Sequence, residues 1–275
     1  MKKLTLYLFS LLSSANLFAQ TPENIIAQAR YKLTHYYDTT NTTLNTQENY
    51  DLLLGKNSSV FKSYDKFIQD SIMRAEFART KAVAPPQGRK ANREEIYFYK
   101  LEQKLFTTTS LLVGNYMVER SNPKIKWEIL PENKVIAGYQ AQKAVGDFNG
   151  RNYTAWFTLE LPFNAGPWKL NNLPGLILEA IDSTNRIKFE LISFKNISNS
   201  QETTIWDKKL STITWDEYKK LAKAYQDDPK GFTEKRIGAV ITSVNGKPIP
   251  TQNPLMPKKA FNFPLEALEF YTIQQ

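Results

Sequence analysis

The sequence contains no cysteine and only one histidine, His35. Without cysteine the chain can form no disulfide, no thiol nucleophile and no cysteine-ligated zinc site. A serine–histidine–aspartate triad would depend on His35, but this residue lies in an alternating segment typical of a strand, and no GxSxG motif is present. The glycine-rich phosphate-binding motifs and the acidic calcium-binding loop are absent too. We therefore predict no catalytic residue set, no metal site and no cofactor.

Long hydrophobic runs are also absent, apart from a short one near the N-terminus. Lys2 and Lys3 precede the apolar run Leu4–Leu12, and small residues and a cleavage site after Ala19 follow it. These features are typical of a signal peptide, whereas a membrane-spanning helix needs about 20 apolar residues. We predict a signal peptide at 1–19, no transmembrane segment, and export through the inner membrane to the periplasm. Association with the outer membrane and release outside the cell both stay open.

Acidic residues are outnumbered, since 27 Asp and Glu stand against 36 Lys and Arg and give a net charge of +9. A surplus of this sign favours anionic membrane surfaces or polyanions. The basic residues are scattered along the chain, however, whereas tails that bind polyanions carry them in blocks. We interpret the surplus as a solvated basic surface and predict no nucleic-acid partner.

The chain is rich in strand-like segments, in which apolar and polar residues alternate between about residues 30 and 197. Two stretches have helical spacing instead, at about 65–81 and 214–225. The predicted fold class is mainly β (α+β), with a strongly curved antiparallel sheet or partial barrel around the longer helix. No repeat or linker divides the chain, so we predict one β-rich domain over 20–275 with a loop-rich tail from about 227.

Two hairpins stand out in the second half of the chain. The segments 138–148 and 151–161 flank Asn149-Gly150, a dipeptide that favours the type I′ turn because both of its positions need a positive φ. The segments 176–182 and 187–197 are joined by the polar residues 183–185 and form the second predicted hairpin.

Between these hairpins lies the densest run of Trp, Phe, Pro and Gly, within 153–182. Gly166-Pro167 is a constrained corner, and residues 173–176 (Leu-Pro-Gly-Leu) fit a type II turn with Gly175 at the position of positive φ. Trp168 supplies enough apolar surface to hold the loop against the sheet. A loop of this length is often functional, and the alternative, that Trp168 only plugs one end of the sheet, stays open.

The segment GYQAQKAVGDFNGRNYTAWFTLELPFNAGPWKLNNLPGLILEAID and the opening YKLTHYYDTTN resemble the GLPGLI family of secreted Bacteroidetes proteins. The similarity extends to about Phe194. Asn172 replaces the first glycine of the name-giving motif, and Ala141 stands where many members carry cysteine. Asn accepts a positive φ better than most residues, so the turn can survive the replacement. The resemblance implies a secreted envelope protein and carries no established activity.

From these observations we expect a non-catalytic envelope protein. It would bind an apolar small molecule or an outer-membrane protein through a concave sheet face and the loop Gly166–Ile177. The candidate contact residues are Tyr139, Arg151, Trp156, Gly166, Pro167, Trp168, Leu173, Pro174, Gly175, Leu176 and Ile177. Two alternatives stay open: a hydrolase that uses the carboxylates of Glu160, Glu179 or Asp182, and a purely structural envelope protein. The sequence does not predict an oligomeric state.

Overall fold

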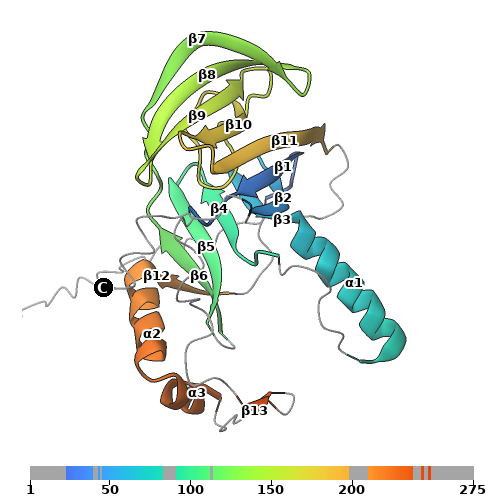
Figure 1. Ribbon diagram of the computed structural model, residues 1–275, viewed down its shortest axis with the longest axis vertical. Coiled ribbons are helices and arrows are strands. Elements are labelled where there is room, and N and C mark those ends of the chain that lie inside the picture. The colour runs from blue at the N-terminus through green and yellow to red at the C-terminus, as the bar shows by residue number, and fades with distance from the viewer. Residues whose placement is uncertain are drawn as a thin grey trace, which may run out of the picture.

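The computed structural model describes residues 23–39, 43, 45–82, 91–111, 114–197, 210–237, 243–244 and 247–248. The predicted signal peptide and most of the predicted tail lie outside these ranges. The described chain forms a 12-stranded sheet, a separate two-stranded ribbon and three helices. The large sheet is strongly curved but does not close into a barrel (Figure 1). The predicted fold class is therefore confirmed.

The sheet is built from two antiparallel meanders that meet at its centre. The first meander consists of β1 (Ala27–His35), β2 (Thr46–Leu54), β3 (Ser58–Ser63), β4 (Glu95–Tyr99), β5 (Lys104–Leu111) and β6 (Gly114–Arg120). The second consists of β7 (Trp127–Ile136), β8 (Tyr139–Phe148), β9 (Arg151–Thr158), β10 (Leu176–Asp182) and β11 (Ile187–Asn196). Antiparallel pairing of β1 with β11 joins them.

The remaining short elements lie toward the C-terminal end of the described chain. Strand β12 (Ser211–Thr214) pairs with β6 in parallel and forms one edge of the large sheet, and β7 forms the other edge. The separate ribbon consists of β13 (Ser243–Val244) and β14 (Lys247–Pro248).

The alternating sequence decides which side chains face inward. Along β1 every second residue is buried, because successive side chains of a strand point to opposite faces. Tyr31 and Leu33 therefore enter the core, whereas Arg30 and Lys32 face outward. The hairpin β8–β9 turns at Asn149 (φ 53°) and Gly150 (φ 75°), as predicted for a type I′ turn.

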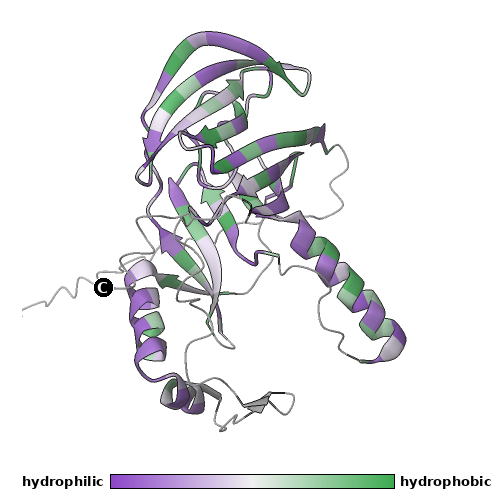
Figure 2. Cartoon of the chain, in the orientation of Figure 1, coloured by the Kyte–Doolittle hydropathy of each residue, from purple (hydrophilic) through white to green (hydrophobic). Residues whose placement is uncertain are grey.

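Helix α1 (Tyr64–Thr80) begins at Ser63, whose side chain accepts a hydrogen bond from the Lys66 backbone N–H. The helix projects away from the sheet (Figure 1), and none of its residues is buried. Its apolar positions, such as Phe67 and Ile72, are 55% and 62% exposed. Figure 2 shows green, hydrophobic bands on the projecting helix. The expectation that the sheet curves around this helix is wrong.

Helix α2 (Trp215–Asp227) covers the lower end of the sheet, where Tyr225 packs against Tyr116 and Val118 of β6. A capping box at Thr214 and Glu217 fixes its start. A third helix, α3 (Pro229–Ile237), follows directly, in a stretch for which no helix was predicted. None of the described helices is long and apolar enough to cross a membrane.

Candidate functional site

The long connection from β9 to β10 fills the inside of the curved sheet. Two backbone hydrogen bonds join the end of this connection to its first half: Leu176 N donates to Leu161 O (3.1 Å), and Ile177 N donates to Ala165 O (3.0 Å). The buried hydroxyl of Tyr31 donates to Ile177 O at 2.7 Å and ties the loop to β1. The prediction that this loop folds back on the sheet is confirmed.

The loop turns at positions other than the predicted one. Gly175 has no positive φ, so the type II turn at 173–176 is wrong; the left-handed residues are Trp168 (φ 56°) and Asn172 (φ 72°). Asn172 thus has the positive φ that asparagine was expected to accept in place of the family's glycine. Glycine is needed at 175 for space, because a Cβ there would lie 2.0 Å from Thr158 O.

Trp168 lies at the centre of this arrangement and is only 5% exposed. Its ring stacks on Phe189 of β11 (centroids 6.4 Å apart, 15° between planes) and contacts Phe148 edge-on at 5.2 Å. Burial of a large aromatic side chain contributes about 2–3 kcal/mol, so Trp168 fixes the loop to the core. The concave face that was expected to receive a ligand is occupied by this loop.

A small recess remains between the loop and the sheet. Its cavity volume is about 20 Å³, little more than the space that one water molecule needs. Its sheet side is mostly apolar, with Leu52, Phe61 and Leu105 beside Ser59, and its loop side includes Trp168, Lys169 and Asn171. Trp168 Nε1 and Asn171 Oδ1 are buried without a hydrogen-bond partner among the described residues. Such atoms are rare in folded proteins, and with the recess beside them they make the β9–β10 loop the candidate functional region.

The other predicted contact residues do not share one surface. Trp156 lies on the outer face of the sheet, where Lys134 Nζ stands 4.3 Å from its ring centroid and 2.7 Å from Glu179 Oε1. Tyr139 contacts Phe194 edge-on (centroids 6.4 Å apart), and Arg151 opens β9 at the hairpin. The loop residues are buried in the core, apart from the exposed Pro174. The buried loop residues are Gly166, Pro167, Leu173, Gly175, Leu176 and Ile177.

The three carboxylates proposed for a hydrolase are separated. Asp182 is 1% exposed and accepts bonds from the backbone N–H groups of Arg186 and Ile187, both 2.7 Å long. Glu179 stands three residues away on the same strand, so its side chain points to the opposite face. Glu160 accepts from the Gln140 backbone N–H at 2.7 Å, outside the strands. These residues do not form an acid–base pair.

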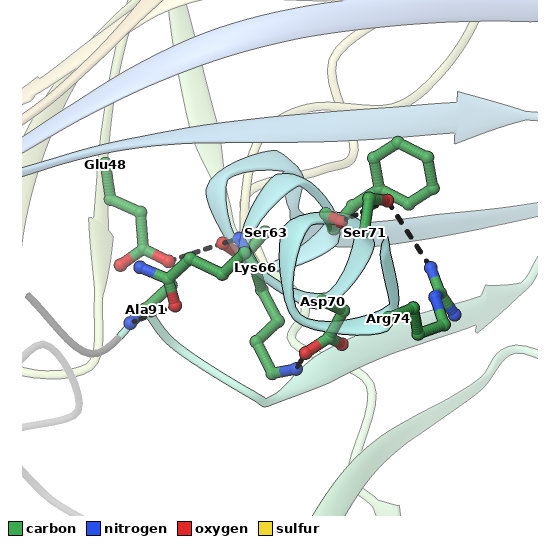
Figure 3. Close-up of polar contacts among 9 residues, drawn as sticks. Glu48, Ser63, Lys66, Asp70, Ser71, Arg74 and Ala91 are labelled. Carbon is green, nitrogen blue, oxygen red and sulfur yellow. Dashed lines mark hydrogen bonds and ion pairs between the residues drawn. The ribbon is translucent and has the colours of Figure 1, made fainter. Parts of the chain in front are cut away.

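A further buried carboxylate, Glu48 of β2, was not singled out from the sequence. It accepts bonds from Ser63 Oγ at 2.5 Å and from the Asn92 backbone N–H at 2.8 Å. Figure 3 shows Glu48 beside Ser63 at the start of α1, with Lys66 paired to Asp70 on the helix. Because Ser63 also caps the helix, Glu48 anchors α1 to the sheet. The alternation of β2 places Glu48 on its buried face, and this was the only available signal.

The described residues offer no obvious metal site: within those ranges no three His, Cys, Asp or Glu side chains gather where they could hold an ion. The electrostatics of the core are dominated by desolvation. Burial raises the pKa of Tyr31 and of Tyr153 well above the ordinary range, so both phenols stay neutral and serve as hydrogen-bonding or packing groups.

Comparison with known proteins relates this chain to one protein family and to two solved structures. Residues 36–219 match the family model described as "N-glycanase peptide, N-terminal domain". Two solved structures of PNGF-II, in different space groups, share the fold with a TM-score of 0.50 at 15% sequence identity. Each alignment covers 71% of this chain and 32% of the solved chain, so this chain spans about a third of their length. No curated protein sequence matches the chain.

These findings overturn two predictions. The GLPGLI resemblance is wrong, because the family that matches is a different one. The residues at 173–177 that the family motif shares have a packing explanation here. The side chains of Leu173, Leu176 and Ile177 are buried where the loop enters β10, and Gly175 permits the close approach to Thr158. The predicted non-catalytic envelope-binding function is wrong as well, since the matching family is named for an N-glycanase. With the match extending over most of the chain, this protein belongs to the family of N-glycanase N-terminal domains.

Proposed function

We propose that this chain takes part in the enzymatic removal of N-linked glycans from glycopeptides. The observation that carries the proposal is the family match over 36–219, which includes both meanders from β2 onward, the central loop and the start of α2. The fold shared with PNGF-II supports it. This chain spans about a third of the length of those solved structures. We therefore propose that it contributes to the reaction, and we assign catalysis to no particular acid–base pair within it.

Export forms part of the same proposal. The basic start, the short apolar run and the site after Ala19 support secretion, and the periplasm is the compartment we propose. A chain exported in this way can meet glycoproteins outside the cytoplasm.

The direct test compares glycan release by secreted fractions of the producing cells with and without this chain. A synthetic glycopeptide with one N-glycan is incubated in H₂¹⁸O, and mass spectrometry follows the conversion of its glycosylated Asn to ¹⁸O-labelled Asp. We expect release to fall when the chain is deleted and to return when the purified chain is added. Equal release in all three samples would refute the proposal.

The purified chain alone is assayed in parallel, at a stoichiometric amount, with heat-unfolded chain as the control. Conversion in the folded sample only would show that the chain cleaves by itself. Conversion only after mixing with the secreted fraction of the deletion cells would show that it acts together with another component.

A further inference from the structure

Helix α1 exposes a stripe of apolar residues to solvent. Phe67, Ile68 and Ile72 are 55%, 37% and 62% exposed, and none of the 17 residues of the helix is buried. Residues spaced by three or four positions share one face of a helix. The apolar stripe defined in this way consists of Tyr64, Phe67, Ile68, Ser71, Ile72, Ala75 and Ala78. Large apolar side chains that gather on one exposed face mark an interaction surface.

The apolar stripe changes from large to small side chains along the helix. Its N-terminal half includes Tyr64 and Phe67, and its C-terminal half includes the exposed Ala75 and Ala78. A parallel pair of such helices would place large residues against large ones and alanine against alanine. An antiparallel pair centred on Ser71 instead places Phe67 of each helix over Ala75 of the other. Facing large and small residues pack without voids, so the shape of the stripe fits an antiparallel copy of itself.

The charges beside the apolar stripe favour the same arrangement. Asp70 and Arg74 lie one turn apart on one margin of the stripe. The Asp70 side chain is 42% exposed and pairs with Lys66, and Arg74 donates to Ser71 Oγ at 3.4 Å (Figure 3). A two-fold axis near Ser71 brings Asp70 of each antiparallel copy beside Arg74 of the other. A parallel pair would bring like charges together, which opposes association.

The position of α1 suits an antiparallel pair. The helix projects away from the sheet (Figure 1), and its 17 residues extend over about 26 Å. The two sheets of an antiparallel pair lie at opposite ends of the paired helices, whereas a parallel pair would bring both sheets to the same end. One helix pair of this length is smaller than a standard interface of about 1,600 Å². We therefore expect an association that reverses on dilution.

The polar residues of α1 argue against a membrane as the partner. Helices that lie on anionic membranes carry mainly Lys and Arg beside their apolar face. In α1 three acidic residues stand against three basic ones, so the helix has no basic surplus. They are Asp65, Asp70 and Glu76, and Lys66, Arg74 and Arg79.

We propose that the apolar stripe of α1 binds the same stripe of a second copy of this chain in antiparallel orientation, and that the chain forms a homodimer. Phe67 of each copy packs on Ala75 of the other, and Asp70 of each copy pairs with Arg74 of the other. The inference does not depend on the proposed function, since it rests on helix α1 alone.

Sedimentation velocity of the purified chain over a wide range of concentration tests the association. We expect the sedimentation coefficient to rise with concentration toward that of a dimer. Phe67→Asp should abolish the rise. Leu101→Asp is the matched control, because Leu101 is 74% exposed and lies in the turn between β4 and β5, away from the apolar stripe; this variant should behave like the unaltered chain.

Cross-linking tests the orientation, because the sequence contains no cysteine of its own. Ser71→Cys places the two thiols near the two-fold axis, so oxidation should join the chains into a covalent dimer. Ala78→Cys places its two thiols 14 residues apart along an antiparallel pair, about 21 Å, which is beyond the reach of a disulfide. Only a parallel pair would cross-link at both positions.

A charge exchange tests the pairing of Asp70 with Arg74. Asp70→Arg places two arginines beside each other across the pair and should weaken the dimer. The double variant Asp70→Arg and Arg74→Asp restores opposite charges across an antiparallel pair and should recover the dimer. Recovery separates the loss of an ion pair from a loss of folding, since the double variant also lacks both native side chains.

Three results would overturn the proposal. They are a monomer at every concentration, a dimer that Phe67→Asp leaves unchanged, and equal cross-linking of Ala78→Cys and Ser71→Cys. If the chain is monomeric, co-sedimentation with phosphatidylglycerol vesicles would assign the apolar stripe to a membrane surface, and no co-sedimentation would assign it to a different protein. Glycan release is measured separately, so the dimer and the proposed function can each fail alone.

Discussion

Replacement of Gly175 by alanine is expected to destabilise the fold by about 3 kcal/mol, the upper end of the range for overpacking a core. The added Cβ would lie 2.0 Å from the carbonyl oxygen of Thr158 and 2.8 Å from its carbonyl carbon. Both are backbone atoms at the end of β9, and Thr158 is the register partner of Leu176. No side chain can rotate away, so the strand pair itself has to separate.

The assay is urea unfolding followed by tryptophan fluorescence, because Trp168 is buried against the loop. A loss of this size lowers the folded-to-unfolded ratio by more than about 100-fold and should move the midpoint without changing the slope. Gly138→Ala is the matched control, since a Cβ at 138 meets nothing within 4 Å and the cost comes only from its φ of 90°. That cost is about 1–2 kcal/mol. An equal loss in the two variants would refute the steric argument.

The other two predictions concern capping groups. Asp182→Ala leaves the Arg186 and Ile187 N–H groups of the β10–β11 hairpin without their acceptor; we expect a loss of about 2–4 kcal/mol in urea unfolding, and a value near zero would show that water replaces the carboxylate. Bonds from Thr214 lower the pKa of Glu217 below its ordinary value of 4.5. Its stabilisation of the α2 start is therefore complete above pH 4.5 and is lost as the pH falls through the lowered folded pKa. Protection of the amides at the α2 start, expressed relative to their intrinsic exchange rates, should fall over that interval in the native chain but not in Glu217→Ala; parallel pH profiles would contradict the assignment.

Local patterns were sufficient to predict most of the secondary structure. Asn149-Gly150 predicted its turn because only a few residue types accept two positive φ angles in sequence. The alternation around His35 predicted a strand, and the same alternation accounts for which side chains of β1 are buried. The pairing of β1 with β11 was not predictable in this way, because it joins segments more than 150 residues apart and no local signal distinguishes one antiparallel partner from another.

The prediction of helix α1 was correct about the helix itself but wrong about its position relative to the sheet. Its apolar spacing indicated a buried face, and the curved sheet offered an interior for it. Trp168 and the rest of the β9–β10 loop occupy that interior, however, so Phe67 and Ile72 remain exposed. Both the helix and the β9–β10 loop could be recognised in the sequence as apolar segments. Hydrophobic periodicity does not show which of the two occupies the interior of the sheet.

The candidate site was only partly within reach of the sequence. The density of aromatic residues and glycine predicted the loop, and Trp168 was among the residues expected to matter. Asn171 was not, because its role depends on Asn122 and Gln103, which are distant in the chain. A single asparagine beside Asn172 carries no sign of an unused oxygen. Only the folded arrangement of the three amides shows that this oxygen is buried without a partner among the described residues.

The cost of this arrangement argues against a purely structural loop. A tryptophan with positive φ costs about 1–2 kcal/mol, and each buried unpaired polar atom costs about 1–3 kcal/mol. Phenylalanine at 168 and leucine at 171 would fill the interior without the two unpaired atoms. Burial of the Trp168 ring offsets part of this cost, but that gain does not require an indole N–H or an amide oxygen. Packing alone therefore does not explain why these two positions hold an indole N–H and an amide oxygen.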